Sequence, residues 1–246
     1  MMAIDIITRN FFRLMRSGAL NEYVELEPMS IFKWNRLTEI IISQDVITVA
    51  SRGIKNFQYD TRFNMPQSLR DKIHSLAAES AKQNIQLKMT NSLLDKRLNK
   101  IHVIERNSDN YSKDTLDLFD IIIANCQAML NRGTSTRLII QLGNYIRIKG
   151  TNIDYGKIDK WLLEMQMRRV AQLVGSILIS NFSFKQNEVP FVKKIDPKAA
   201  QVMMQCIIKR KNEKHNSGIT YFEYAPLENA SIILGRLKTR LDSIDE

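Results

Sequence analysis

Glycine and proline are scarce in this chain, and their scarcity constrains the fold more than any other feature. The 246 residues include nine glycines and five prolines, about half the share found in an average protein. Because tight turns depend on these two residue types, few turns are available. Long helices with short connections fit that supply, whereas a sandwich or barrel of many strands does not. We therefore expect an all-α fold: an irregular multi-helix bundle with one long helix and at most minor β structure.

Apolar residues recur at the helical spacing of three and four along most of the chain. The first stripe begins at Ile4 and ends at Met15, and we expect Gly18 to stop that helix. The stretch from 46 to 53 continues helically or forms a short strand, since it is rich in Ile, Val and Thr. Residues suited to begin later helices are Ser30, Ser112, Thr134 or Ser135, and Asp154. Gly175 lies inside an apolar stripe, where we expect it to allow a close helix contact.

The segment from Gln67 to about Ile104 has apolar residues at nearly heptad spacing and contains no glycine or proline. This pattern predicts one very long helix or two nearly collinear helices. Polar residues interrupt the middle of the stripe, so packing there is loose or depends on a partner, which allows a helix-mediated homodimer. The polar stretch 105–112 is the best candidate boundary. It separates an N-terminal helical arm, 1–104, from a C-terminal helical bundle, 113–246, unless the two form one continuous domain.

Motifs for catalysis or metal binding are absent from the sequence. The three histidines are far apart, and no nucleophile elbow, Walker loop or dinucleotide fingerprint occurs. Asp114, Asp117 and Asp120 are spaced at i, i+3 and i+6. Carboxylates near a helix start are stabilised by the helix dipole without a metal, so we expect a solvated face rather than a magnesium site. We therefore assign no catalytic residue, no metal ligand and no cofactor.

The chain is basic, with a formal net charge of +10 and a pI near 9.6. Half of this excess lies in 192–214, which holds seven cations and two carboxylates. The candidate anion or nucleic-acid contacts in and near this stretch are Lys209, Arg210, Lys211 and Lys214. Cations at a helix C-terminus are also stabilised by the dipole without a ligand, and phosphate contact is the functional alternative.

The sequence contains no run of 18 apolar residues, so no membrane span is expected. Cys126 and Cys206 lie in apolar stretches, which is typical of reduced thiols in a cytoplasmic protein. The N-terminal stretch interleaves arginines with apolar residues. A docked amphipathic helix explains it better than a mitochondrial presequence.

Several short stretches resemble one bacterial family. These are residues 11–18, 34–37, 50–54, 130–133 with Arg137, 153–154 and 161–162. They are similar to the helical regions of the uncharacterised nucleotidyltransferase-like proteins of Bacteroidetes and other bacteria. The resemblance covers about half of the chain and identifies it as a degenerate relative.

The catalytic part of that family has no counterpart here. Such transferases need a Gly-Ser turn for the nucleotide phosphates and an Asp-x-Asp for magnesium. Gly175 and Ser176 lie inside an apolar helix, and Gln141 stands where the resemblance implies an acidic residue. The resemblance therefore implies a helical frame without the catalytic insert.

We accordingly expect a non-catalytic helical binding or scaffold protein whose partner is a protein. One alternative is a nucleic-acid-binding regulator that uses the basic C-terminal patch. A second is a nucleotidyltransferase-like protein with an unrecognised site, in which Arg132 and Arg137 would bind anions.

Overall fold

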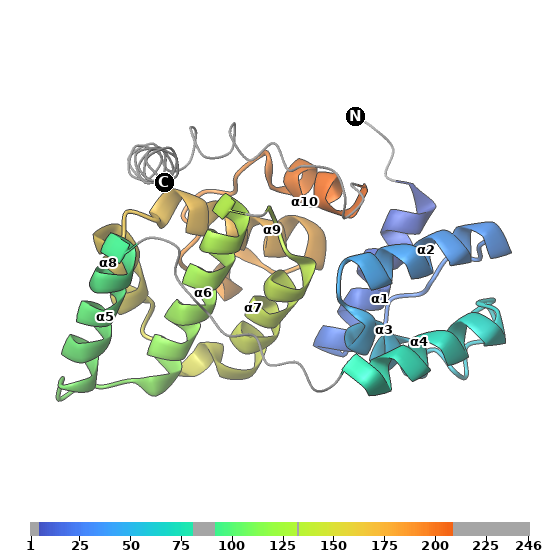
Figure 1. The fold of residues 1–246 in the computed structure, drawn as a ribbon, viewed down its shortest axis with the longest axis horizontal. Helices are drawn as coiled ribbons and strands as arrows, with labels where there is room; N and C mark the ends of the chain where they lie inside the picture. Colours follow the sequence, from blue (N-terminus) through green and yellow to red (C-terminus); the bar gives the residue numbers. More distant parts are fainter. Residues whose placement is uncertain (1–4, 81–91, 132, 209–246) are drawn as a thin grey trace, which may run out of the picture.

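The computed structural model describes residues 5–80, 92–131 and 133–208 (Figure 1). In these ranges the chain forms ten α-helices and two 3₁₀ turns, with no strand, so the predicted all-α multi-helix fold is confirmed. The α-helices are α1 (Ile6–Leu20), α2 (Ile31–Ser43), α3 (Ile47–Asn56), α4 (Gln67–Ser80), α5 (Ser92–Arg106), α6 (Lys113–Asn131), α7 (Thr136–Lys149), α8 (Tyr155–Glu164), α9 (Arg168–Phe182) and α10 (Ala199–Ile208). The 3₁₀ turns are η1 (Gly150–Asn152) and η2 (Gln186–Glu188).

Helices α1 to α4 gather at one end of the molecule (Figure 1). Helix α1 packs against α3, and α3 packs against α4. The predicted cap at Ser30 is present, because its hydroxyl accepts from the Lys33 backbone N–H. The 46–53 stretch is helical rather than a strand, and a left-handed residue at Asp45 (φ 54°) separates α3 from α2.

Gly18 does not end the first helix, which corrects the prediction from sequence. Helix α1 continues to Leu20, and Asn21 closes it in the left-handed conformation (φ 54°). Gly18 instead lies where α1 crosses α3, and a Cβ there would be 1.9 Å from the carbonyl oxygen of Val49. Gly53 faces it across the crossing, and its Cβ would be 2.6 Å from the carbonyl oxygen of Leu14. The two glycines allow the two helix backbones to touch.

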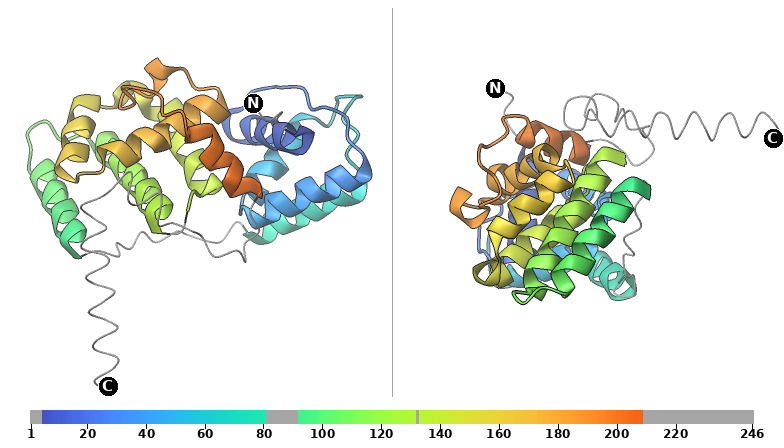
Figure 2. Two further views of the ribbon diagram at one scale, coloured as in Figure 1. Left: turned by 90° about the horizontal axis from the view of Figure 1, so that it is seen from above. Right: turned by 90° about the vertical axis from the view of Figure 1, so that its left-hand side faces the viewer.

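Helices α5 to α10 form the other end of the molecule (Figures 1 and 2). Helix α6 packs against α7 and α9, α8 contacts α6 and α9, and α10 packs along α9. The predicted caps at Ser135 and Asp154 are confirmed, since each side chain accepts from a backbone N–H of the first turn. Gly175 does have close neighbours, but they are Phe191 and Val192 of the segment after η2 rather than another helix.

The expected single helix over 67–104 is wrong, and so is the collinear pair. Helix α4 packs on α2 and α3, whereas α5 lies at the opposite end of the molecule (Figures 1 and 2). Arg97 of α5 donates to the carbonyl oxygen of Glu164 in α8, and His102 bonds Asp120 in α6 at 2.7 Å. The near-heptad stripe thus serves two separate packing surfaces: Ile73 is buried in α4, and Ile101 is buried in α5. The division into 1–104 and 113–246 stays a prediction, although α5 contacts the helices that follow it.

The two ends of the molecule meet along α1, α7 and α9. Phe12 of α1 and Phe182 of α9 stack edge to face, with ring centroids 5.5 Å apart. Gln44, just after α2, donates to the carbonyl oxygen of Cys206 in α10 and accepts from the Thr136 hydroxyl at 2.7 Å. The junction therefore combines apolar packing with polar contacts that have defined partners.

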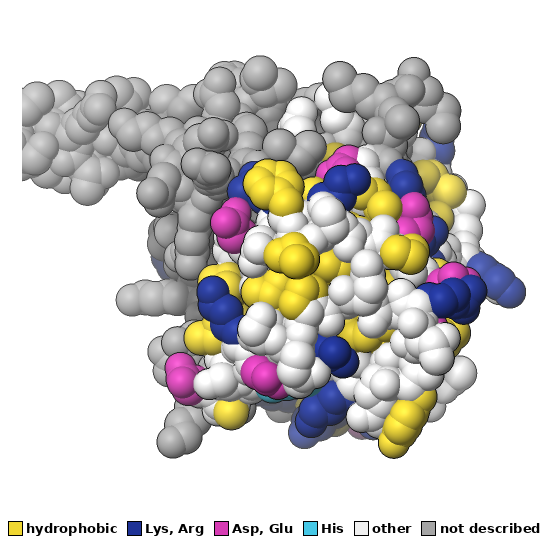
Figure 3. Space-filling model, turned by 90° about the vertical axis from the view of Figure 1, so that its right-hand side faces the viewer, with side chains coloured by type: hydrophobic (Ala, Val, Ile, Leu, Met, Phe, Trp, Pro, Cys, Tyr) yellow, Lys and Arg dark blue, Asp and Glu magenta, His cyan; other side chains and the backbone are white. Residues whose placement is uncertain are grey.

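No helix within the described ranges is both long enough and apolar enough to cross a membrane. The end of the molecule formed by α2, α4 and the turn after α3 carries apolar side chains on its surface (Figure 3). The strongly exposed apolar side chains at this end are Tyr23, Ile31, Phe32 and Tyr59. We call these four residues the apolar end.

Candidate anion-binding site

The candidate site is a cavity of about 400 Å³, open to solvent, between α8, the start of α9 and the segment after η2. Helix α8 buries Ile158, Trp161 and Leu162 in the core. Its opposite face is therefore left to line the cavity, through Tyr155, Gly156, Asp159, Lys160 and Leu163. We call this space the cationic cavity, because Lys160, Arg168 and Lys193 line it against one carboxylate, that of Asp159.

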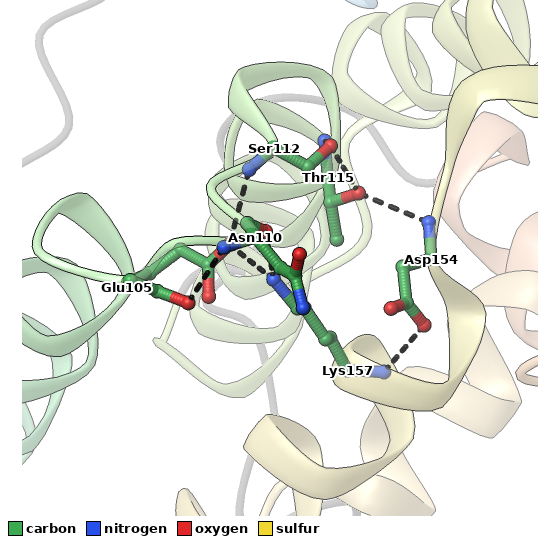
Figure 4. A network of polar contacts seen from close by, with 7 residues as sticks. Glu105, Asn110, Ser112, Thr115, Asp154 and Lys157 are labelled. Carbon is green, nitrogen blue, oxygen red and sulfur yellow. Dashed lines mark hydrogen bonds and ion pairs between the residues drawn. The ribbon is translucent and has the colours of Figure 1, made fainter.

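A polar network holds the start of α8 in place (Figure 4). The buried carboxylate of Glu105, at the end of α5, accepts from the Lys157 ammonium at 2.6 Å and from the Ser112 backbone N–H at 3.1 Å. The Asp154 side chain caps α8, and its own backbone N–H donates to the Thr115 hydroxyl at 3.0 Å. The ends of α5, α6 and α8 are thereby joined, and the cavity face of α8 has a fixed orientation.

Arg168 reaches the cavity because the chain reverses between α8 and α9. Gln166 adopts the left-handed conformation (φ 57°) in this reversal. The Arg168 guanidinium then donates to Asp159 Oδ2 at 3.0 Å. The second oxygen of Asp159, Oδ1, is buried and has no hydrogen-bond partner among the described residues.

Lys193 is brought to the cavity by the apolar residues before it. Phe191 and Val192 are buried against Gly175 of α9. The Gln186 side-chain amide donates to the carbonyl oxygen of Lys193 at 3.1 Å, which anchors the segment. Lys193 is exposed, and neither its ammonium nor that of Lys160 has a hydrogen-bond or ion-pair partner within residues 5–80, 92–131 and 133–208.

The electrostatic balance of the cavity favours an anion. Three cations and one carboxylate give a formal charge of +2. Burial raises the pKa of Tyr155 to about 12, so its hydroxyl stays protonated at neutral pH. Two ammonium groups and a guanidinium can donate hydrogen bonds to the several oxygens of a phosphate group.

The anion contacts predicted from sequence are in different places. Arg137, at the start of α7, forms an ion pair with Asp45 at 2.6 Å, at the junction of the two ends. It does not line the cationic cavity. The remaining candidates, Arg132, Lys209, Arg210, Lys211 and Lys214, lie outside the described residues, and their role stays a prediction.

The acidic series in α6 is partly paired rather than fully solvated. Asp114 lies 3.4 Å from the Lys149 ammonium, and Asp120 bonds His102. Within the described ranges, no three His, Cys, Asp or Glu side chains form a group that could hold a metal ion.

Sequence reasoning did not select Tyr155, Lys160 or Arg168. A signal was present in the charge distribution, because residues 133–208 carry eleven Lys and Arg against five Asp and Glu. Which of these cations share a cavity depends on the chain reversal at Gln166 and on the anchoring of Lys193, neither of which has a sequence motif.

Comparisons with known proteins do not identify a family for this chain. A scan of family models, a search of curated proteins and a search of solved structures found no match to this chain. The resemblance to nucleotidyltransferase-like proteins therefore stays a prediction.

Proposed function

We propose that this protein is a non-catalytic binding protein that holds a phosphate-bearing ligand in the cationic cavity. The observation that carries this proposal is the convergence of Lys160, Lys193 and Arg168, with one carboxylate among them, on one cavity. Asp159 is paired with Arg168, so the like charges of Lys160 and Lys193 repel each other in the cavity without a counter-charge of their own. A bound phosphate would relieve that repulsion and accept their hydrogen bonds.

The direct test is thermal unfolding in increasing inorganic phosphate at constant ionic strength, with chloride as the reference salt. We expect the melting temperature to rise with phosphate concentration, because a ligand that binds the folded state stabilises it by mass action. The Lys160→Ala/Lys193→Ala double variant should lose most of this rise. A matched control is Lys55→Ala/Lys72→Ala, which removes the same charge from exposed sites on α3 and α4. No phosphate-dependent rise, or an equal loss in the control, contradicts the proposal.

A phosphate group can belong to a small ester or to a nucleic-acid backbone. Labelled single-stranded and double-stranded oligonucleotides distinguish these sources, because backbone binding weakens steeply as salt increases. Salt-dependent retention that the Lys160→Ala/Lys193→Ala variant lacks would support the nucleic-acid regulator. Retention unchanged in that variant assigns the contact to other cations, such as the predicted Lys209 and Arg210, and removes nucleic acid as the ligand of this cavity.

A second candidate function, self-association, is favoured by the apolar end. Tyr59 is 89% exposed and Phe32 is 78% exposed, and aromatic residues are enriched in protein interfaces. Ion pairs between Arg62 and Glu25 and between Arg36 and Glu39 place both signs of charge at this end. Such a surface is complementary to itself and has little attraction for a polyanion, so a second copy of this chain is the occupant that it fits.

Sedimentation velocity over a range of protein concentrations tests this second candidate. We expect dimers that Phe32→Asp abolishes. Ile148→Asp, at a 67% exposed position on α7, should leave them unchanged. A monomer at every concentration, or equal loss in both variants, rules out the interface.

Both candidates agree with a cytoplasmic protein, which we propose because Cys126 and Cys206 are free thiols.

A further inference from the structure

A second cavity, of about 300 Å³, adjoins the cationic cavity at Tyr155, which lines both. The phenol hydroxyl lies on the side of the second cavity, because a Cβ on its lining residue Gly150 would be 3.3 Å from that oxygen. No described residue forms a hydrogen bond with the hydroxyl. Tyr155 thus belongs to the lining of two adjoining spaces of different character.

The charges that line the second cavity are already balanced. The Arg147 guanidinium contacts Glu188 at 2.7 Å and Glu22 at 3.1 Å, and it lies 4.3 Å above the Phe184 ring. The other carboxylate oxygen of Glu188 accepts from the Lys185 backbone N–H at 2.7 Å. The charged residues that line the second cavity are therefore paired, and they have no excess charge to attract an ion.

Neutral polar groups remain in the second cavity. They are the Tyr155 hydroxyl, the Thr151 hydroxyl and the Asn187 side-chain amide. The Asn187 amide has no hydrogen-bond partner within the described ranges. Groups of this kind bind alcohols, because each can both donate and accept.

We propose that the two cavities form one site for the phosphomonoester of a polyhydroxylated compound. The phosphate occupies the cationic cavity, and the hydroxyl-bearing part passes Tyr155 into the second cavity. This inference rests on the proposed function, because it requires phosphate to bind beside Lys160 and Lys193. The two volumes each fall within or near the range of small-molecule sites in proteins.

Isothermal titration calorimetry with three probes tests the inference: inorganic phosphate, butyl phosphate and glucose 6-phosphate. Butyl phosphate carries the same charged group but no hydroxyls. We expect glucose 6-phosphate to bind at least about tenfold more tightly than butyl phosphate, since two or more neutral hydrogen bonds contribute about that much.

The Tyr155→Phe variant removes one hydroxyl and keeps the ring. It should reduce the preference for glucose 6-phosphate by about fivefold and leave the Kd of inorganic phosphate unchanged. Tyr111→Phe is the matched control, at an exposed phenol between α5 and α6 that lines neither cavity. Asn187→Ala provides a second variant, with the same expected loss, if Tyr155→Phe unfolds.

The outcomes separate the two proposals. If phosphate binds but glucose 6-phosphate and butyl phosphate bind equally, the two-cavity site is wrong and the proposed function stands. The same conclusion follows if neither Tyr155→Phe nor Asn187→Ala changes the preference. If inorganic phosphate does not bind at all, the proposed function fails and the inference fails with it.

Discussion

Glu27 shows how one side chain can tie an irregular segment to a helix. It lies in the connector between α1 and α2, and its carboxylate binds Arg9 at 2.7 Å and Arg13 at 2.8 Å, both on α1. Its backbone also pairs with the buried Asn10 amide in both directions. These arginines lower the pKa of Glu27 from 4.5 to about 2, chiefly through the Arg9 hydrogen bond.

This pKa predicts a pH-dependent contribution to stability. A carboxyl whose pKa is lower in the folded state stabilises the protein above its unfolded pKa, and this stabilisation is lost as pH falls towards the folded value. We expect Glu27→Gln to lower the melting temperature at pH 6, and the difference from the wild type to shrink between pH 4.5 and about 2. Glu39→Gln, at an exposed glutamate paired with Arg36, is the control. A difference that stays constant over this range contradicts the prediction.

Glu105 is the second residue whose removal should have a large effect. It is 4% exposed and accepts from both the Lys157 ammonium and the Ser112 N–H. Glu105→Ala should lower the free energy of unfolding by about 2 to 3 kcal/mol, because it leaves a partly buried cation and a backbone donor without their acceptor. Urea unfolding measures this change. Glu79→Ala, at an exposed position in α4, should change stability by less than about 0.5 kcal/mol; equal effects would show that Glu105 has no special role.

At the scale of whole elements, the crossing of α1 and α3 depends on Gly18 and Gly53. Gly18→Ala should cost about 2 to 4 kcal/mol, since its Cβ would overlap the Val49 carbonyl and force the backbones apart. Thermal or urea unfolding checks this. Gly150→Ala is the control, because its Cβ would lie 3.3 Å from the movable Tyr155 hydroxyl and at an ordinary contact distance of 3.7 Å from Ile146. A stable Gly18→Ala protein would mean that the two helices can separate freely.

The helices themselves could be predicted from the sequence to the extent that their signals are local. Capping at Ser30, Ser135 and Asp154 depends on a side chain and a backbone group three residues away, and all three caps are present. The sequence predicts a stop at Gly18 because a glycine near the end of an apolar stripe has that role in many helices. Its actual role depends on α3, more than thirty residues later, which no local pattern shows.

At the scale of the whole molecule, Gln44 links the two ends through Cys206 and Thr136. Burial raises the pKa of the Cys206 thiol to about 11, so little thiolate exists at pH 8 and alkylation should be slow. Gln44→Ala removes three hydrogen bonds across the junction, one of them donated by the Cys206 thiol itself. We expect the loss of cover over the thiol to outweigh the loss of a hydrogen bond that lowers its pKa, so that iodoacetamide modifies Cys206 at least about tenfold faster. Mass spectrometry of the modified peptides measures the rates.

The control for this prediction is Gln67→Ala, which removes a glutamine that bonds the exposed Asp71 on its own helix. It should not alter the rate at Cys206. Wild-type Cys206 that reacts as fast as a fully exposed thiol would contradict the partial burial of this residue at the junction.

The candidate site was less predictable than the fold. The sequence predicts a basic protein with half of its excess charge in 192–214, but of the three cavity cations Lys193 alone lies in that stretch. The cavity itself brings together side chains from 155 to 193, and their meeting depends on how α8 and α9 pack. Arg137, selected from sequence, is paired with Asp45 across the junction instead.

Arg147 belongs both to the second cavity and to the contact between the two ends, through Glu22 of the connector after α1. A ligand in the proposed second-cavity site would therefore affect the contact between the two ends. A ligand that strengthened the ion pair between Arg147 and Glu22 would strengthen the contact between the α1 connector and α7. A ligand that competed for the guanidinium would weaken that contact. Because such coupling is reciprocal, a protein in which the contact between the two ends is strengthened would bind the ligand that strengthens the Arg147–Glu22 pair more tightly.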